Sequence, residues 1–351
     1  MLMTQSGKPV PAAAIGGMKW TSNLYGVVNI KKSIKTLDKA LQQGFFHIDT
    51  ADCYLGSNGN LDSETFIGAV LNKKFLDTTM AREEIFISSK CGIKLNSTQA
   101  WHREIDISPQ YITTACEASL ARLQTSYLDL FYLHRISEAN NTIEESMQAM
   151  SVLLLGGKIR YVGLSEANVN VILRADCELR HLTSGKHGIS AIQTEYNFLH
   201  RAPEKDGVFR LCQEQNMSFF AYSPLCRGLA TDTTMIFSEN DCRKGLERFQ
   251  GEHLAHNQMV MENVRKLAQY NGYSLAQLAI AWLITQTKSF NILAYPVFGT
   301  ADPEHLIENI VALTMKLDIN LLSDINELLP IGVGKGLRYP KLDMQEFKLT
   351  Y

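Results

Sequence analysis

The chain carries no excess of charge of either sign, because 34 Lys and Arg residues are balanced by 36 Asp and Glu residues among its 351 positions. This balance excludes a polycation and gives no electrostatic reason to expect nucleic acid as a partner. The hydrophobic fraction of 45% argues against an acidic disordered chain. No apolar run approaches the roughly 18 residues that a membrane helix needs, so we expect no membrane partner.

The first 17 residues have one Lys and a short Ala run but no apolar core of the kind found in signal peptides, so we expect no signal peptide. The seven cysteines are odd in number, and no two are spaced as CxxC. That pattern disfavours a disulfide framework and a zinc site. We therefore expect no metal and a reducing, cytoplasmic compartment.

The chain also has no low-complexity tract, Gly/Ser-rich linker or visible repeat, and we expect one domain over residues 1–351. Short β-branched or aromatic runs alternate with longer segments of helical periodicity, which makes eight strand–helix units. The predicted strands cover residues 14–20 (a weak pattern), 45–50, 84–90, 126–134, 158–166, 189–196, 217–224 and 291–299. The predicted helices cover residues 30–44, 62–75, 108–123, 142–157, 168–180, 206–216, 252–272, 274–287 and 302–313.

This alternation indicates an α/β fold with parallel strands. Parallel strands need crossover helices, and strands that are buried on both faces read as continuous apolar runs, as at 85–87, 128–133 and 219–222. Eight units in about 300 residues favour a single (β/α)8 TIM barrel. The competing architecture is a doubly wound open sheet, and the absence of GxGxxG after the first strand counts weakly against it.

Four polar residues reach the ends of consecutive predicted strands, where a barrel of this kind carries its function. They are Asp49, Tyr54, Lys90 and His134. An ammonium beside a Tyr hydroxyl stabilises the phenolate and lowers its pKa, and a carboxylate keeps that ammonium charged and fixed. A neutral His donates a hydrogen bond to a carbonyl oxygen. The set predicts a proton donor aimed at an oxygen that gains negative charge, as carbonyl reduction by hydride requires.

Each of these residues also has a plain structural interpretation. Asp49 fits a capped turn, Lys90 fits a solvated charge, and His134 fits a core histidine whose hydrogen bonds are satisfied. Their joint placement on one rim favours the functional interpretation, which depends on where the predicted strands end.

Long patterns occur in a fixed order along the chain: GFFHIDTADCYLGSNGNLDSETFIG (44–68), ISSKCG around Lys90, SLARLQTSYLDLFYLHR (119–135), GGKIRYVGLSEAN, AIQTEYN, FFAYSPLCRGLAT and GTADPEHLIENI. In these patterns the sequence resembles the aldo-keto reductase family over about residues 13–325. The resemblance implies the same barrel and a catalytic tetrad of Asp49, Tyr54, Lys90 and His134. It assigns Tyr54 as the general acid and base, with no metal.

The resemblance also implies a nicotinamide cofactor, NADP(H) in most of the family, that delivers hydride from C4. Ser165 and Gln193 match residues that bond the carboxamide, and Tyr222 matches the ring under the nicotinamide. The remaining predicted cofactor contacts are Ser223 and Leu225 at the pyrophosphate, and Gly299, Thr300, His305, Glu308 and Asn309 toward the adenosine end.

Three departures from the family pattern bear on the cofactor. Glu166 follows Ser165 where Asn is usual, which keeps a hydrogen-bond acceptor but adds charge. Ala301 and Asp302 stand where many relatives place Lys or Arg for the 2′-phosphate, so NAD(H) is a real alternative. Leu55 replaces the glycine that usually follows the catalytic Tyr.

Two further segments are similar to cofactor-site or pocket regions of the family. Residues 227–257, including Asp241, Cys242 and Arg243, match a loop that folds over the cofactor, with a surface excursion as the alternative. The tail from about residue 322 places Arg338 and Tyr339 at the edge of the substrate pocket. Trp101 and His102 are pocket candidates, although plain packing explains them equally well.

The sequence therefore predicts an NAD(P)H-dependent oxidoreductase that interconverts a carbonyl compound and an alcohol. An alternative within the enzyme class is an NAD-dependent dehydrogenase of sugar hemiacetals. An alternative from another class is a cofactor-sensing auxiliary subunit of a channel with little turnover. Neither the substrate nor the oligomeric state follows from one sequence.

Overall fold

The chain closes eight parallel strands into a barrel, in the spatial order β1-β10-β9-β8-β7-β6-β3-β2. The computed structural model describes residues 1–351 apart from 58–60, 96–102, 234, 240, 342–343 and 345–351, and this strand count refers to the described residues. The strands are β1 (Ala14–Gly16), β2 (His47–Asp49), β3 (Phe86–Cys91), β6 (Leu128–Leu133), β7 (Ile159–Ser165), β8 (Ile189–Glu195), β9 (Ser218–Tyr222) and β10 (Ala294–Phe298).

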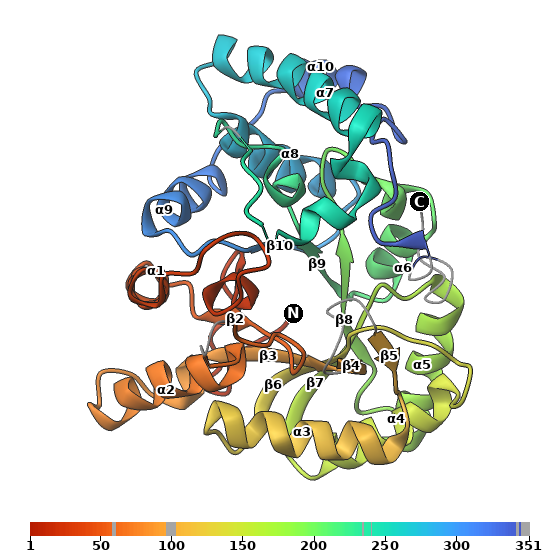
Figure 1. The fold of residues 1–351 in the computed structure, drawn as a ribbon. Helices are drawn as coiled ribbons and strands as arrows, with labels where there is room; N and C mark the ends of the chain where they lie inside the picture. Colours follow the sequence, from red (N-terminus) through yellow and green to blue (C-terminus); the bar gives the residue numbers. More distant parts are fainter. Residues whose placement is uncertain (58–60, 96–102, 234, 240, 342–343, 345–351) are drawn as a thin grey trace.

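Helices follow the barrel strands and surround them (Figure 1). They are α1 (Ile30–Gln42), α2 (Ser63–Leu76), α3 (Pro109–Leu123), α4 (Ile143–Leu155), α5 (Val169–Leu182), α6 (Val208–Glu214), α7 (Gly251–Tyr270), α8 (Leu275–Ser289), α9 (Pro303–Ala312) and α10 (Ile319–Leu328). Most begin at a polar residue whose side chain accepts a first-turn N–H: Asn29, Asp62, Ser108, Thr142, Asn168, Ser274, Asp302 and Asp318. Short polar residues at these boundaries made the helix starts readable in the sequence.

The closed sheet confirms the predicted (β/α)8 barrel and excludes the doubly wound open sheet. Strand β1 completes the closure, since it pairs in parallel with β10 on one side and with β2 on the other. The register sets Asp49 beside Ser88 and Ser165 beside Gln193. The carboxyl ends of the strands therefore meet at one rim.

The first predicted strand, 14–20, is wrong in its second half. Strand β1 ends at Gly16, and Met18–Trp20 form a 3-10 turn. The chain turns inward there because Trp20 is fully buried and its indole N–H donates to the Thr300 carbonyl at 2.9 Å. A Cβ at Gly17 would lie 2.7 Å from Oγ of Ser63, so the turn passes too close to α2 for a larger residue.

A hairpin and a helix were absent from the sequence-based expectation. The long loop after β3 contains an antiparallel hairpin of β4 (Ile93–Leu95) and β5 (Arg103–Ile105). Helix α10 covers the region where a tail was expected from residue 322, and it packs on α7 and α8. Figure 1 shows α7 and α10 side by side, outside the ring of helices.

Buried side chains fill the barrel interior as a cluster of their own. Its members are Leu2, Val10, Ala14, Phe86, Leu130, Tyr132, Ala191, Phe220, Tyr295 and Val297. The N-terminal segment contributes Leu2 and Val10, and Arg160 at the start of β7 donates to the Met3 carbonyl at 2.8 Å. The segment therefore closes the end of the barrel opposite the carboxyl rim.

The tail after α10 returns to the carboxyl rim and is fixed on the way. Asn257 and Lys335 exchange two hydrogen bonds of 2.9 Å, one in each direction. Gly336 has φ +80°, and a Cβ there would lie 2.5 Å from the backbone nitrogen of Arg248. This crossing requires glycine, and it sets the position of Arg338 two residues later.

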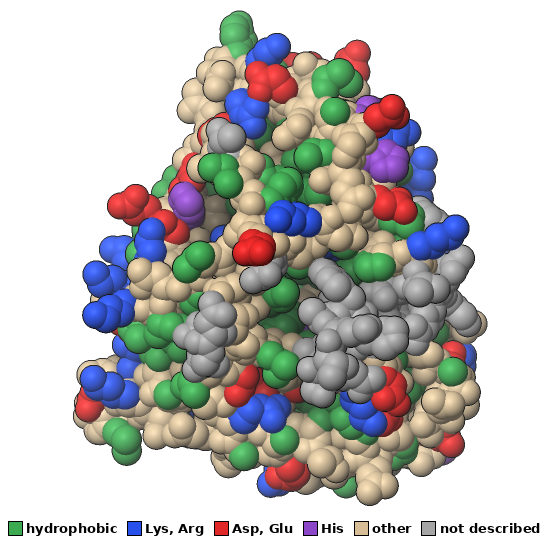
Figure 2. All heavy atoms as spheres, viewed as in Figure 1, with side chains coloured by type: hydrophobic (Ala, Val, Ile, Leu, Met, Phe, Trp, Pro, Cys, Tyr) green, Lys and Arg blue, Asp and Glu red, His purple; other side chains and the backbone are tan. Residues whose placement is uncertain are grey.

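Charge is mixed on the face seen in Figure 2, where Lys and Arg side chains are interspersed with Asp and Glu side chains on the coloured part of the surface.

None of the helices in the described part of the chain has the length and apolar character that crossing a membrane demands.

Candidate active site

The four residues of the predicted tetrad lie together at the carboxyl rim. Asp49 ends β2, Lys90 lies in β3, His134 directly follows β6, and Tyr54 lies in the loop after β2. The Lys90 ammonium donates to Oδ1 of Asp49 at 2.5 Å and to the Thr50 carbonyl at 2.7 Å. It also lies 5.2 Å from the centre of the Tyr54 ring. The Tyr54 and His134 rings meet edge to face with centroids 5.7 Å apart, so the four side chains form one cluster.

The Lys90–Asp49 pair is shielded from solvent. Lys90 is fully buried and Asp49 is 3% exposed, and each charge offsets the cost of burying the other. Oδ2 of Asp49 accepts from Nε2 of Gln193 at 2.9 Å and from the Ser88 hydroxyl at 3.2 Å. With every contact supplied by a barrel strand or its end, the carboxylate and the ammonium are held in one geometry.

The pKa of the Tyr54 hydroxyl lies well above its ordinary value. Burial is the main cause, the Asp49 carboxylate adds to it, and the Arg135 guanidinium acts in the opposite direction. The net shift is therefore opposite to the lowering that was expected from Lys90, because burial and the Asp49 carboxylate dominate it. A neutral phenol is the form that donates a proton, so Tyr54 is suited to act as an acid.

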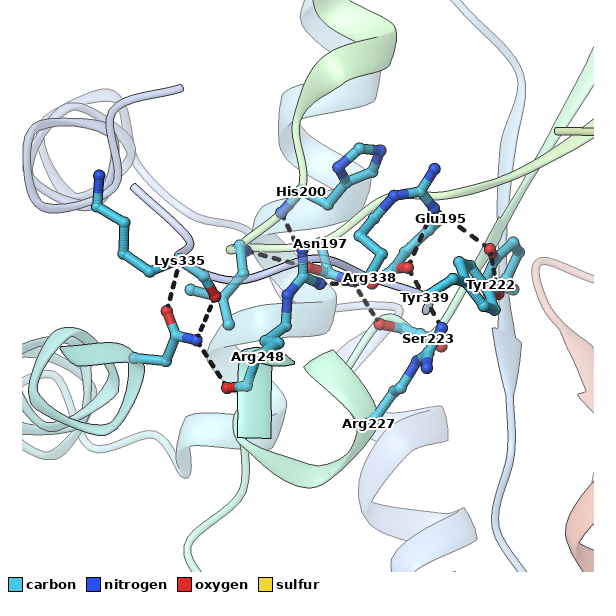
Figure 3. A network of polar contacts seen from close by, with 12 residues as sticks. Glu195, Asn197, His200, Tyr222, Ser223, Arg227, Arg248, Lys335, Arg338 and Tyr339 are labelled. Carbon is cyan, nitrogen blue, oxygen red and sulfur yellow. Dashed lines mark hydrogen bonds and ion pairs between the residues drawn. The ribbon is translucent and has the colours of Figure 1, made fainter. Parts of the chain in front are cut away.

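A second polar cluster joins the ends of β7 and β8 to the tail, and Figure 3 shows its members Glu195, Arg227, Arg248 and Arg338. Nη2 of Arg338 donates to Oε2 of Glu166 at 2.7 Å, and its Nη1 donates to Oε2 of Glu195 at 3.2 Å. Glu195 also pairs with Arg248 at 3.0 Å and with Arg227 at 3.6 Å. We term these five residues the rim cluster. All of their side chains are buried, and Arg338 is only 1% exposed.

Two tyrosine hydroxyls extend the rim cluster. The Tyr222 hydroxyl donates to Oε1 of Glu166 at 2.7 Å and lies 2.8 Å from the Tyr339 hydroxyl. The Tyr222 hydroxyl has a single O–H donor, and it is used in the hydrogen bond to Glu166. In the hydrogen bond between the two hydroxyls, Tyr339 is therefore the donor and Tyr222 the acceptor. The Tyr339 hydroxyl in turn accepts from Nη2 of Arg135 at 3.0 Å, while Nη1 of Arg135 donates to the Ser165 hydroxyl at 3.3 Å. A chain of hydrogen bonds therefore runs from Arg135 to Glu166.

Arginine charges set the ionisation of these groups. Burial favours the neutral form of Glu166, but Arg338 and Arg135 outweigh it and lower the pKa of the carboxyl to about 2. Burial likewise favours neutral Tyr339, and Arg227 and Arg135 outweigh it, so the pKa of this phenol is lowered. Glu166 is thus a carboxylate throughout the neutral range.

The predicted cofactor residues fall into two groups. Ser165, Gln193, Tyr222, Ser223 and Leu225 lie at the ends of β7, β8 and β9, beside the tetrad. Gln193 is bonded to Asp49, and the Ser223 carbonyl accepts from Nδ2 of Asn197 at 3.0 Å. Ser223 has φ +53°, so the chain turns sharply where β9 ends.

The second group comprises Gly299 and Thr300 in the connection after β10, and His305, Glu308 and Asn309 within α9. A Cβ built on Gly299 meets nothing within 4 Å, so the chain borders open space there. Glu308 accepts from the Ser274 hydroxyl at 2.5 Å, and Asn309 is buried whereas His305 is exposed. Asp302 caps α9 and pairs with Lys32 at 2.5 Å.

Sequence reasoning gave no individual role to Arg135, Glu195, Arg227 or Arg248, although the last two lie in the predicted cofactor loop 227–257. Arg135 and Glu195 stand at predicted strand ends, so a count of strand-end charges points to them, whereas Arg227 and Arg248 lie in a segment without periodicity. Trp101 and His102 lie outside the described residues. Within the described residues, no group of three or more His, Cys, Asp and Glu side chains is placed to hold a metal ion.

A closed barrel with a cluster of polar side chains at its carboxyl rim is the arrangement of a TIM-barrel enzyme. The chain belongs to the aldo-keto reductase family, since the family model described as Aldo/keto reductase family matches residues 13–330. It is 32% identical over 335 residues to probable aldo-keto reductase 1 of Glycine max, which covers 95% of this chain and 89% of that protein. It is also 32% identical over 337 residues to aldo-keto reductase yakc of Schizosaccharomyces pombe, whose name includes NADP(+), covering 94% and 92%.

Solved structures of the same family share the fold. The glycerol dehydrogenase of Gluconobacter oxydans superposes with a TM-score of 0.73 at 24% identity, over 94% of both chains. An aldo-keto reductase of Bacillus halodurans in its holo form gives 0.71 at 24% identity, over 97% of this chain and 98% of that one. The predicted family and fold are confirmed, and membership makes the protein an oxidoreductase of a family that generally uses NAD(P)H.

Proposed function

We propose that the protein is an NAD(P)H-dependent oxidoreductase that reduces an aldehyde or a ketone to an alcohol, or runs the reverse reaction, with Tyr54 as the proton donor. The observation that supports this most directly is the buried Lys90–Asp49 pair beside the Tyr54 ring. The family gives the class of reaction, and the geometry of the rim suggests which side chains perform it.

Each tetrad residue has its own task in this proposal. Tyr54 donates its hydroxyl proton to the carbonyl oxygen as that oxygen gains electron density. His134, whose ring lies against that of Tyr54, orients the same oxygen by a hydrogen bond. Lys90, held in place by Asp49, stabilises the phenolate that remains after the proton has left. A nicotinamide bound at the rim supplies the hydride from its C4.

The charge of the rim fits an anionic dinucleotide. Four guanidinium groups and two carboxylates lie there on buried side chains, namely those of Arg135, Arg227, Arg248 and Arg338 and of Glu166 and Glu195. This excess of positive charge over the two carboxylates favours an anionic ligand nearby, although the donors of Arg338 itself are taken by Glu166 and Glu195.

The donor and acceptor set also fits the proposed contacts. We assign Ser165, Gln193 and Tyr222 to the nicotinamide, Ser223 and Leu225 to the pyrophosphate, and Gly299, Thr300, His305, Glu308 and Asn309 to the adenosine end. The hydroxyl of Ser165 and the amide of Gln193 provide donors and acceptors beside the tetrad. The open space at Gly299 leaves the backbone accessible at the far end.

We propose NADP(H) as the cofactor, in line with the name of the Schizosaccharomyces pombe relative, with NAD(H) as the alternative. Ala301 offers no cation to a 2′-phosphate. The pairing of Asp302 with Lys32 neutralises the carboxylate that would repel one, so the site neither attracts nor rejects the phosphate strongly. An NAD-dependent dehydrogenase of sugar hemiacetals therefore stays a second candidate.

We further propose that residues 1–351 form a single, cytoplasmic catalytic domain and that the 227–257 segment folds over the dinucleotide. That segment is anchored at the rim, because its Arg227 and Arg248 pair with Glu195 at the end of β8, at 3.6 and 3.0 Å. The Tyr339 hydroxyl lies beside the Tyr222 hydroxyl, which supports a place for the tail at the edge of the substrate pocket.

Fluorescence titration with NADPH and NADH, followed by steady-state turnover of an aldehyde and ketone panel with the tighter cofactor, tests the proposal. Sustained turnover that is lost in Tyr54→Phe is the expected result. Tight cofactor binding with a single burst and no turnover would instead favour the cofactor-sensing subunit. Turnover only in the direction of sugar oxidation with NAD would favour the hemiacetal dehydrogenase.

A further inference from the structure

Arg338 lies in the C-terminal tail, yet its guanidinium is buried at the ends of two barrel strands (Figure 3). It holds both oxygens of Glu166, with Nη2 2.7 Å from Oε2 and Nη1 3.2 Å from Oε1. The tail is already fixed by the paired hydrogen bonds of Lys335 and Asn257. A buried ion pair adds little net stability compared with apolar packing, so anchoring alone does not account for this contact.

Glu166 occupies a position where its charge matters for the proposed function. It directly follows Ser165, and the Tyr222 hydroxyl donates to its Oε1 at 2.7 Å. If Tyr222 lies under the nicotinamide and Ser165 bonds the carboxamide, the Glu166 carboxylate borders the same ring. The ring carries a positive charge when oxidised and none when reduced, so an uncompensated carboxylate there stabilises the oxidised form.

The structure supplies the compensation. Arg338 is the direct partner of Glu166, and Arg135 acts on it from a longer distance. The second carboxylate of the rim cluster, Glu195, has two further arginines of its own, Arg227 and Arg248. Removing Arg338 therefore exposes the charge of Glu166 while Glu195 stays paired.

We propose that Arg338 is a positioning residue that neutralises Glu166 and thereby sets the relative affinity of the site for the oxidised and the reduced dinucleotide. The inference rests on the proposed function. In this proposal Arg338 acts through its hydrogen bonds to Glu166.

A double-mutant cycle tests the inference by dissociation constants and needs no turnover. The oxidised and the reduced form of the same dinucleotide are titrated into the wild type, Arg338→Gln, Glu166→Gln and the double variant. Arg338→Gln should shift the ratio of the two constants about tenfold or more toward the oxidised form, because a carboxylate is left beside the ring. Glu166→Gln should shift it the other way, and the double variant should return to within about threefold of the wild type.

Two further variants separate charge from anchoring. Arg201→Gln is the matched control, because Arg201 is also buried and holds the tail through the Leu329 carbonyl at 2.7 Å, yet its ion pair is with Glu204. Its ratio should equal that of the wild type. Arg338→Lys keeps the charge and should stay within about threefold of the wild type. The dinucleotide titrations are done at about pH 7 and at about pH 9. If loss of Arg338 raises the pKa of Glu166, this carboxyl is still ionised at the higher pH.

The inference is overturned if Arg338→Gln and Glu166→Gln both fold and bind the dinucleotide but keep the wild-type ratio of dissociation constants for its oxidised and reduced forms. Arg338 would then only anchor the tail. If Arg338→Gln does not fold, Glu166→Gln decides alone: a shift toward the reduced form supports the inference, and no shift overturns it. A wild type that binds neither dinucleotide overturns the proposed function itself, a result that is distinct from an unaltered ratio.

Discussion

The ammonium nitrogen of Lys90 lies over the face of the Tyr54 ring, 5.2 Å from its centre. A cation in this position stabilises the ring when its hydroxyl loses a proton and does little to the neutral ring beyond a modest cation–π attraction. The contact is therefore more useful after proton transfer than before it, which is the property expected of a catalytic partner.

Tyr54→Phe removes the proposed proton donor and leaves the ring packed against His134. We expect kcat for carbonyl reduction to fall by about 10² or more, while the dissociation constant of the cofactor stays the same. Steady-state kinetics and fluorescence titration measure the two quantities. Tyr161→Phe, near the amino end of β7 and thus at the opposite end of the barrel, is the control and should leave both unaltered. An unchanged kcat in Tyr54→Phe would refute the assigned role.

The raised pKa of Tyr54 predicts the pH dependence of the reaction. The proton-donating form is present below that pKa and is lost only as the pH rises through it, so reduction should stay level from about pH 6 to about pH 9. The reverse reaction needs the phenolate, so it should accelerate with pH over the same range. The measurement is a pH–rate profile in each direction. A rate of reduction that decreases as the pH rises from about 6 to about 9 would contradict the assignment.

Lys90→Met removes the cation that stabilises the phenolate and leaves Asp49 buried without its ion-pair partner. We expect reduction at neutral pH to drop at least about tenfold and the alkaline limb of the reverse reaction to move to higher pH. Lys94→Met, which breaks a surface pair with Asp106, is the matched control and should keep the wild-type profile. Retention of that profile in Lys90→Met would exclude the proposed role of the ammonium.

The tetrad was readable from the sequence because each member stands at or near the end of a strand with a strong local pattern. His134 ends one apolar run and Lys90 follows another, so finding the strands was enough to bring them to one rim. The placement of Asp49 and Tyr54 followed in the same way. Side-chain geometry was not readable, and the net rise in the pKa of Tyr54 comes from burial that only the folded chain creates.

The rim cluster could not be predicted, because Arg338 is separated by 172 residues from Glu166 and by 143 from Glu195. No periodicity links positions so far apart, and their proximity depends on the course of the tail after α10. The hairpin of β4 and β5 was missed for a related reason: three-residue strands carry too few side chains to show alternation.

Ala301→Arg should give the protein a preference for the phosphorylated dinucleotide. Position 301 follows Thr300 at the start of the β10–α9 connection, and a guanidinium there offers paired donors to a 2′-phosphate. We expect weak discrimination in the wild type and a gain of about tenfold or more in the NADPH-to-NADH affinity ratio in the variant. Ala301→Gln is similar in length but neutral and should leave the ratio near that of the wild type. A wild-type preference for NADPH beyond about 10³ would show that other residues already supply the charge.

Asp52→Asn should stabilise the protein, increasingly so as the pH rises. Burial and the nearby Glu64 carboxylate raise the pKa of Asp52 from 3.8 to about 7, and the Tyr111 hydroxyl donates to its Oδ2 at 3.2 Å. Between these values the folded chain holds a proton that the unfolded chain has released, so the wild type loses stability with increasing pH across that window. Asn does not titrate, so the stability gained by the variant over the wild type should be small at about pH 3 and should grow by about 2 to 3 kcal/mol between about pH 5 and about pH 8. Urea unfolding at several pH values measures the difference in unfolding free energy between the variant and the wild type. A difference that does not change with pH would show that the effect comes from packing and not from ionisation of Asp52.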